Sequence, residues 1–448
     1  MTQDVDASRI PELSEVVGLV LAAARKAGAT QAEADASLQK GLTATVRMGE
    51  VDTVEYSRDR GLGITVYFGH RKGSASTGDL SAAAVRETVG KACDIARYTA
   101  EDEFAGLADA SELARDIPDL ELDHPWELTP DAAVVLARTC EAAGRAVDTR
   151  LTNSEGASIT THRGVRVYAN SHGFLAGYPS SSHSVSCVLL AEQGEDMQRD
   201  YWFSSARDPA QLDAVESIGR RAGERAVARL GSRRLATGKA RVLLSPDMGR
   251  GFFGHFLGAI RGGAQYRKAS FLLDSAGQQI FPAFVNMHER PHLTGAQGSA
   301  PFDSEGVVTR DRELLRAGVL DGYVLGSYSA RKLGLRTTGN AGGNYNLSVD
   351  PGPDSLDLAQ LLKKMRRGLW VTELMGQGVN GITGDYSRGA TGFWIEDGAI
   401  AYPVQEVTIA GNLKDMYRNV TAIGSDVDTR GSLHVGSVLL EEMTVAGE

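Results

Sequence analysis

The sequence predicts an α+β protein of two domains. The first carries helices on a mixed or antiparallel sheet, and the second is a glycine-rich, mainly antiparallel β domain. Over about the first 230 residues, stretches with helical spacing of apolar residues alternate with stretches of two-residue periodicity. Beyond them, glycine becomes dense and helical spacing becomes rare. The chain has 52 glycines but only 13 prolines, which indicates a folded protein with many tight turns.

The N-terminal domain is predicted to span residues 1–232. Apolar residues at helical spacing predict the helices 11–27, 81–98, 130–147 and 209–230. The alternating, glycine-punctuated stretch 42–77 predicts strands joined by hairpin turns, and residues 151–203 predict further short strands. A polar connector, residues 100–126, separates the second helix from the third.

The C-terminal domain is predicted to span residues 233–448. It follows a basic linker, GSRRLATGKA, and begins with a short buried strand, ARVLLSPD. Two helices are predicted, over 247–259 and 355–368. The second would begin at Ser355, with Asp357 in its first turn. The remainder is predicted as short antiparallel strands between glycine turns.

Composition excludes several classes of function. The net charge of -10 and the dispersed Lys and Arg residues argue against nucleic acid and anionic membrane as partners. No run reaches the roughly 18 to 20 apolar residues of a membrane helix. The acidic, polar N-terminal segment is unlike a secretory signal, so the expected location is cytoplasmic. The cysteines are odd in number and form no CxxC pair, which favours buried thiols: Cys93, Cys140 and Cys187.

Common catalytic motifs are missing from the sequence. There is no P-loop, no GxGxxG between a strand and a helix, and no GxSxG elbow. The Ser-His run at 180–184 gives little support to a serine nucleophile, because triad residues meet in space rather than in sequence. His288 and His292 have the spacing of helical metal ligands, but Pro291 between them favours a loop.

Four polar strings flanked by glycine are unusual for a plain scaffold: 262–274, 298–307, 328–346 and 384–398. One interpretation is a set of turn-defining loops with internal salt bridges. The other is a set of loops and strand edges that hold an extended peptide by backbone hydrogen bonds. Glycine would help in the second case, because it allows another backbone to approach closely.

The same strings carry a family resemblance. The segments GAIRGGAQYRKASFLLDS, GSAPFDSEGV, YSARKLGLRTTGNAGG and GDYSRGATGFWIEDGAIAYPVQEVTIAGN resemble PmbA/TldE-type proteins of the TldD/PmbA metallopeptidase family. The run RGLGITVYFGHRKGSASTGDLS resembles the first domain of that family, and SVLLEEMTVAGE resembles its closing strand. These motifs are long and in the same order, and together they cover almost the whole chain.

The resemblance implies a two-protein enzyme. Family members pair as a TldD-type and a PmbA-type subunit, and the pair is a zinc-dependent peptidase acting on small or unfolded polypeptides. The TldD-type subunit carries a His-Glu-x-x-x-His helix and a later cysteine ligand. Its zinc activates water, and its glutamate serves as general base.

This chain departs from that motif. In the matching segment RGFFGHFLGAI, Arg250 replaces the first histidine and Gly251 replaces the glutamate, whereas His255 fills the second histidine position. The region of the cysteine ligand reads SDVDTRGSLHVGSV and contains His434 but no cysteine. A catalytic zinc typically has three protein ligands, so His255 and His434 are at most remnants of a degenerate site. We therefore expect no catalytic residue, metal or cofactor on this chain, and expect zinc in the partner.

The function expected from the resemblance is that of a non-catalytic subunit. The chain would dock a TldD-type partner, complete a chamber around the partner's zinc and help to align an unfolded peptide; without the partner it could form a homodimer. The residues expected to line the chamber are Thr338, Gly339, Asn340, Gly342, Gly343, Asn344, Gly378, Asn380 and Arg388. The alternatives are a stand-alone metallopeptidase with a non-standard site, a stand-alone serine enzyme, and a peptide-binding regulator without catalysis.

Overall fold

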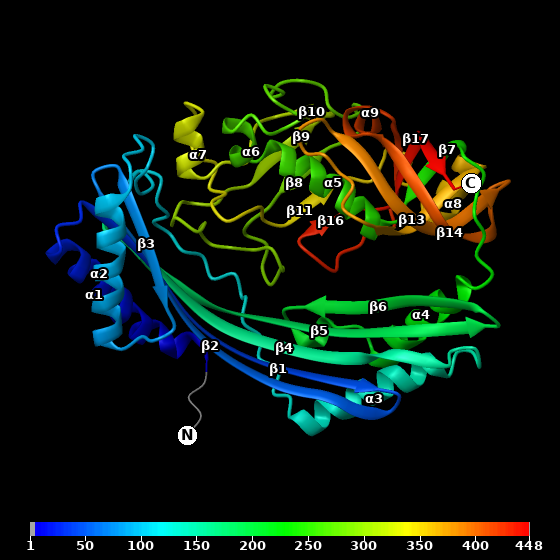
Figure 1. Ribbon diagram of the computed structural model, residues 1–448, viewed down its shortest axis with the longest axis horizontal. Coiled ribbons are helices and arrows are strands. Elements are labelled where there is room, and N and C mark those ends of the chain that lie inside the picture. The colour runs from blue at the N-terminus through cyan, green and yellow to red at the C-terminus, as the bar shows by residue number, and fades with distance from the viewer. Residues whose placement is uncertain (1–4, 448) are drawn as a thin grey trace.

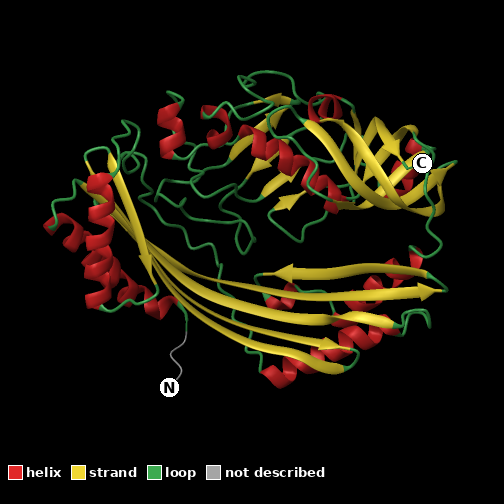
Figure 2. Cartoon of the chain, in the orientation of Figure 1, coloured by secondary structure: helices red, strands yellow, loops and turns green. Residues whose placement is uncertain are grey.

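The computed structural model describes residues 5–447 (Figure 1). Its N-terminal part is a six-stranded sheet in the order β3-β2-β1-β4-β5-β6. Every neighbouring pair in this sheet is antiparallel. The strands are β1 (Gln31–Arg47), β2 (Glu50–Phe68), β3 (Arg71–Thr77), β4 (Asn153–Asn170), β5 (Leu175–Gln193) and β6 (Asp196–Ala206). The sheet is bent into a half-barrel whose open side faces the C-terminal part (Figure 2).

Four helices cover the outer face of the half-barrel: α1 (Ile10–Lys26), α2 (Ala82–Tyr98), α3 (Pro130–Arg145) and α4 (Val215–Ala228). Alternate residues of β1 point into the cores beneath them. Ala34 and Leu38 pack under α1 and α2, and Leu42 and Val46 pack under α3 and α4. The four predicted helices are therefore present, although the fourth begins at Val215. A separate 3-10 turn, Pro209–Gln211, occupies the start of its predicted range.

The strands between α3 and α4 are much longer than expected. The prediction of short strands over 151–203 was wrong, because β4 has 18 residues and β5 has 19. Gly164 and Gly177 lie within these strands rather than in turns. Pro179 is tolerated because β6 pairs with β5 only from His183 onward, so β6 does not need the N–H that proline lacks.

The inner face of the half-barrel is lined by hydroxyl groups. On β5, Val185 and Cys187 point into the helix-side core, so the alternate serines point to the opposite face. Residues paired directly across neighbouring strands point to the same face, so the pairing of β5 with β4 and of β4 with β1 continues this face over all three strands. Its hydroxyl residues include Thr43, Thr45, Ser158, Thr160, Ser180, Ser182, Ser184 and Ser186. The surface that faces the C-terminal part is therefore polar and built from short side chains.

The C-terminal part contains two mixed sheets. One has six strands in the order β14-β13-β12-β7-β17-β15, with a further β14–β17 pairing that closes a barrel, and the other has the order β10-β9-β8-β11-β16. The strands of the first are β7 (Gly238–Leu244), β12 (Gly368–Met375), β13 (Asp385–Glu396), β14 (Ala399–Asn412), β15 (Val420–Ile423) and β17 (Val438–Ala446). Those of the second are β8 (Met287–Glu289), β9 (Arg312–Arg316), β10 (Val319–Leu320), β11 (Leu347–Val349) and β16 (Leu433–His434).

Most neighbouring strands of the C-terminal part are antiparallel, as predicted, but two pairs are parallel. β7 pairs with β12 in parallel, and β11 pairs with β16 in parallel. Parallel neighbours need a long crossover, and more than 100 residues separate β7 from β12. Such long-range pairing leaves no local signal in the sequence.

Two longer helices of the C-terminal part match predicted ones: α5 (Pro246–Ile260) and α8 (Leu358–Met365). α8 begins later than expected, because Asp357 and Gln360 form a reciprocal capping box at its start. Ser355 precedes it with a φ of 45° and is not its cap. Short helices that were not predicted are α6 (Gly262–Tyr266), α7 (Ser327–Lys332) and α9 (Leu413–Arg418). Across residues 5–447, every helix is too short or too polar to cross a membrane.

Candidate functional site

The start of α5 is held by a network of four charged side chains. Arg250 pairs with Asp247 one turn earlier on the helix, and also with Asp428, at 2.7 Å. Arg430 pairs with Asp428 at 2.7 Å and with Asp247 at 3.2 Å. Each arginine thus contacts both carboxylates, and the network fixes the loop before β16 against the first turns of α5.

Arg430 also joins this network to the half-barrel. Its guanidinium lies 3.8 Å from the ring centre of Trp202 and 4.2 Å from that of Phe203, and donates to the Phe203 carbonyl at 3.1 Å. Burial alone would raise the pKa of Asp428. Hydrogen bonds from Arg430 and the charges of Arg250 and Arg430 outweigh burial and hold that pKa well below its usual value. The carboxylate is therefore ionised at neutral pH, and the ion pairs persist.

The residues around α5 do not fit a zinc site. Arg250 occupies the position of the expected first histidine and is committed to two carboxylates. His434 lies in β16, where its Nε2 is 2.8 Å from the Gly431 carbonyl of its own loop. Within residues 5–447, no group of three or more His, Cys, Asp or Glu side chains is placed to hold a metal ion. A catalytic zinc would need such a group.

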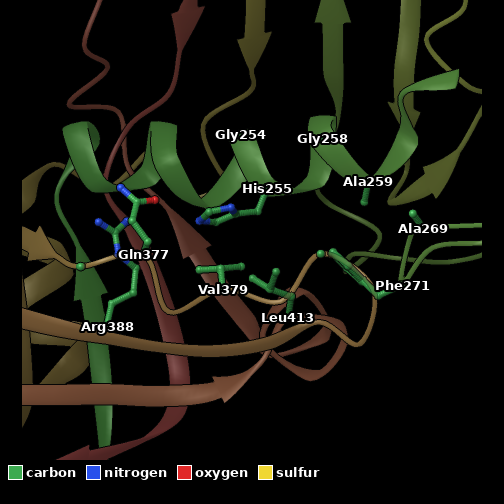
Figure 3. Close-up of a pocket in the computed structure, with 12 residues that line it drawn as sticks. Gly254, His255, Gly258, Ala259, Ala269, Phe271, Gln377, Val379, Arg388 and Leu413 are labelled. Carbon is green, nitrogen blue, oxygen red and sulfur yellow. The ribbon is translucent and has the colours of Figure 1, made fainter. Parts of the chain in front are cut away.

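His255 faces a pocket of about 350 Å³ beside α5, which we name the His255 pocket (Figure 3). Its lining residues come from α5, the loop after α6, the segment before β13, β13 itself and α9: Gly254, His255, Gly258, Ala259, Ala269, Phe271, Gly376, Gln377, Val379, Gly381, Arg388 and Leu413. The glycines and alanines leave the space open. Phe271, Val379 and Leu413 make one part of the wall apolar, whereas His255, Gln377 and Arg388 make another part polar.

The polar part of the His255 pocket is cationic. Burial and then the charge of Arg388 lower the pKa of His255, so its imidazole is neutral at pH 7. The ring of Tyr386 meets His255 edge-on, with 5.9 Å between ring centres. Burial raises the pKa of Tyr386 to about 12, with Arg388 opposing the rise. At neutral pH, Arg388 is thus the charged group among these three.

Part of the expected chamber lining lies at this pocket. Arg388 and His255 both point into it (Figure 3). Gly378 and Asn380 shape the adjoining segment. The Gly378 carbonyl accepts a hydrogen bond from the Ser387 amide at 2.7 Å, and the Asn380 side chain accepts one from the Ile382 amide at 2.9 Å. The structure therefore brings three expected lining residues, Gly378, Asn380 and Arg388, close to His255. In the sequence, His255 was noted only as a possible remnant of a metal site.

The other expected lining group lies around a buried carboxylate. Asn340, Asn344 and the Tyr345 amide donate to Oε1 of Glu289 at 3.0, 3.1 and 2.9 Å. Burial raises the pKa of Glu289, although Arg312 and these donors oppose the rise. The side-chain amides of Asn340 and Asn344 therefore donate to a buried carboxylate of the same chain.

The remaining members of this group shape the same loop. Thr338 accepts a hydrogen bond from the Leu325 amide at 2.8 Å, and Gly339, Gly342 and Gly343 adopt positive φ angles. Thr338 and Gly339 line a separate pocket of about 410 Å³. The residues from Gly378 to Arg388 and those from Thr338 to Asn344 thus do not share one cavity. Contact of either group with a peptide stays a prediction.

Sequence reasoning missed the side chains that complete the α5 network around Arg250, and most of the His255 pocket. Asp428 and Arg430 were read only as part of a segment without cysteine, although their i, i+2 spacing allows the Asp-Arg pair that forms. The apolar wall had no local signal. Phe271, Val379 and Leu413 are far apart in sequence, and only the folded chain brings them together.

Comparison with family models covers most of the chain. Residues 32–96 match the "PmbA/TldA metallopeptidase domain 1", residues 123–230 the "central domain", and residues 237–447 the "C-terminal domain". The first two segments form one sheet here, because β1 pairs with β4 along almost its whole length. The proposed division into residues 1–232 and 233–448 stays a prediction.

Individual relatives span the same length. The chain is 50% identical to the metalloprotease PmbA of Escherichia coli O157:H7, over 99% of this chain and 98% of that protein. A structure from Bacteroides thetaiotaomicron, described as a candidate modulator of DNA gyrase, has a TM-score of 0.92 and 28% identity, covering 98% of this chain and 99% of that one. TldE from Thermococcus kodakarensis has a TM-score of 0.84 at 20% identity, covering 96% and 100%, which shows a shared fold.

Proposed function

Because the chain belongs to the PmbA/TldD metallopeptidase family, we propose that it is the non-catalytic, PmbA-type subunit of a two-chain zinc peptidase. The observation that carries this proposal is the ion-pair network at Arg250. A guanidinium stands where the catalytic subunit is expected to present its first zinc ligand, and two carboxylates hold it there.

The network opposes metal binding in two ways. A zinc ion beside Arg250 would be repelled by a fixed positive charge in a partly buried site, where the effective dielectric constant is low. In addition, Asp247 and Asp428 are neutralised by Arg250 and Arg430, so they are not free to serve as ligands. Zinc and the general base would therefore come from a TldD-type partner.

The contribution of this chain would be a second wall of the chamber. The inner face of the half-barrel, with its short hydroxyl side chains, could contact an extended peptide without selecting strongly among side chains. The segment from Gly378 to Arg388 and the loop from Thr338 to Asn344 are the proposed contacts from the C-terminal part. A closed chamber would admit small or unfolded polypeptides and exclude folded ones.

A reconstitution experiment tests this proposal. The chain alone, a TldD-type partner alone and the co-purified pair would be incubated with an unfolded model polypeptide, and zinc would be measured on the same samples. We expect zinc in both samples that contain the partner and full cleavage only in the pair. Chelator-sensitive cleavage with stoichiometric zinc in this chain alone would replace the proposal with a stand-alone metallopeptidase. Peptide binding without cleavage in any sample would favour a regulator.

A further inference from the structure

Arg388 is a partly buried cation whose charge lacks a counterpart in the described chain. Its Nε is enclosed by the protein and has no hydrogen-bond acceptor among residues 5–447. Its Nη2 donates one long hydrogen bond, of 3.4 Å, to the Leu374 carbonyl. Although the Tyr386 hydroxyl lies within hydrogen-bonding range of Arg388, no carboxylate of residues 5–447 lies within ion-pair distance of the guanidinium.

Among the described residues, Arg145, Arg229 and Arg388 each have an enclosed Nε without an acceptor, and Arg388 lines the His255 pocket. An enclosed N–H of a charged group normally finds an acceptor, because leaving it unpaired destabilises the fold. Acceptors are not scarce, since 57 acidic residues stand against 47 basic ones. Elsewhere in the C-terminal part, Glu373 pairs with Arg229 at 2.5 Å and Glu441 pairs with Arg241 at 2.7 Å. The missing counter-charge at Arg388 therefore points to a group from outside the chain.

The surroundings of Arg388 define the chemistry of that group. No acidic residue lines the His255 pocket. Two further polar side chains, His255 and Gln377, face the same space (Figure 3), and the ring nitrogens of His255 make no hydrogen bond within residues 5–447. Phe271, Val379 and Leu413 line the same space with apolar groups. The pocket thus offers an anion site next to an apolar site.

We propose that the His255 pocket binds a carboxylate attached to an apolar group, and specifically the free C-terminal end of a peptide. The planar guanidinium of Arg388 matches a carboxylate in shape and can donate two parallel hydrogen bonds to it. The Gln377 amide and the His255 ring provide further donors, and the apolar wall accommodates the last side chain. A volume of about 350 Å³ suits one terminal residue. This inference rests on the proposed peptide-handling function and names the part of the peptide that this chain would hold.

Calorimetric titration of the purified full-length chain tests the proposal. The probes are the acetylated peptide Ac-Ala-Ala-Ala-Leu with a free carboxylate, the same peptide with a C-terminal carboxamide, and sodium hexanoate. We expect the free acid to bind roughly 10-fold or more tightly than the amide, since a charge-assisted contact is lost in the amide. Equal affinity for acid and amide would overturn the proposal. Hexanoate binding as tight as that of the peptide acid would overturn the assignment to a peptide end and point to a small free acid.

Variants of Arg388 test whether this residue causes the preference for the free carboxylate. Arg388→Gln should lose the preference for the acid, whereas Arg388→Lys should keep part of it, because the charge remains but the planar pair of donors is lost. Arg418→Gln, in the exposed last turn of α9 and outside the pocket, is the matched control and should bind as the unmodified chain does. Thermal unfolding of each variant checks that it folds. An Arg388→Lys or Arg388→Gln variant that folds and retains the full preference would contradict the assignment.

The same samples separate this inference from the proposed function. If the unmodified chain stimulates a TldD-type partner but binds acid and amide peptides equally, the carboxylate site is wrong and the subunit role stands. If it discriminates between the peptides but never stimulates a partner, the pocket stands and the subunit role is wrong.

Discussion

At the scale of single residues, one unusual ionisable group is a carboxylate in the loop before β9. Asp303 is 1% exposed and accepts hydrogen bonds from the amides of Glu305, Val307 and Ala341 at 2.8 to 2.9 Å. Burial, and then the nearby charge of Glu305, raise the pKa of Asp303 to about 7, whereas the three amides oppose the rise. The backbone donors hold the carboxylate in place, but its charge is unfavourable there.

This pKa predicts that stability falls as pH rises through neutrality. A carboxyl whose pKa is higher in the folded than in the unfolded chain binds more protons when folded, so stability decreases from its usual pKa up to about 7. Between pH 6 and 8, the free energy of unfolding should fall by about 1 kcal/mol from this group alone. Chemical denaturation at several pH values measures the slope.

Glu305→Gln should move that slope to lower pH, because it removes the neighbouring charge while keeping an oxygen that can accept the hydrogen bond from the Ser327 amide. Glu442→Gln, at an exposed ion pair with Lys239, is the control and should leave the slope unchanged. An unmodified chain with no loss of stability between pH 6 and 8, or a Glu305→Gln slope equal to that of Glu442→Gln, would contradict the assignment.

At the scale of elements, close packing of α3 against α4 depends on glycine. A Cβ added to Gly219 would lie 1.9 Å from the Cys140 carbonyl oxygen, a distance that real Cβ atoms do not show. Gly219→Ala should therefore separate the two helices and lower the free energy of unfolding by roughly 2 kcal/mol or more. Gly90→Ala, within α2, is the matched control, since its Cβ would meet nothing within 4 Å.

The two alanine variants should change stability in opposite directions. Gly90→Ala should stabilise the protein by about 0.5 to 1 kcal/mol, because alanine favours the helix. Urea unfolding of both variants measures the difference. Equal effects of the two substitutions would show that the α3–α4 contact is looser than described.

Helices and strands differ in how well they could be predicted from the sequence. Helices with an apolar stripe, such as α1, α2 and α3, were found within a few residues of their ends, because the stripe and caps such as Ser81 and Thr129 are local signals. Strand length was not found, because Gly164 and Pro179 look like breaks unless the neighbouring strand is known. Parallel pairing of β7 with β12 and the wall of the His255 pocket depend on contacts between distant segments. Arg250 and Arg388 were noted from the sequence, but their partners were not.

At the scale of the whole molecule, the connector between α2 and α3 joins the half-barrel to the C-terminal part. The guanidinium of Arg331, in α7, donates to the carbonyls of Phe104, Gly106 and Leu107 at 2.7 to 2.9 Å. A shared apolar cluster lies further along the connector: Ala108, Leu113, Ala114, Tyr168, Phe174, Phe302 and Val307. The connector therefore contacts both parts, alongside direct contacts between them such as that of Arg430 with Trp202 and Phe203.

Arg331→Lys should loosen this junction, because a lysine cannot reach three carbonyls with a planar set of donors. We expect faster cleavage within residues 99–129 by a protease added at low concentration, together with a lower midpoint of thermal unfolding. Arg336→Lys is the matched control. Arg336 also contacts the connector, through Glu112 at 2.6 Å, but its side chain is 84% exposed, so the pair contributes little. Identical digestion of the two variants would contradict a special role for Arg331.

The charge network at the start of α5 also constrains how this chain could evolve. Replacing Arg250 by histidine would remove a cation that two carboxylates share, and would leave Asp247 and Asp428 with Arg430 as their remaining partner in the network. A chain with that single change would be less stable, yet it would still lack the glutamate and the cysteine expected of the catalytic subunit. The Arg250 step toward a metal-binding motif would thus lose stability before any activity appeared. Under this constraint, the division of labour proposed for this chain and a catalytic partner would be difficult to reverse.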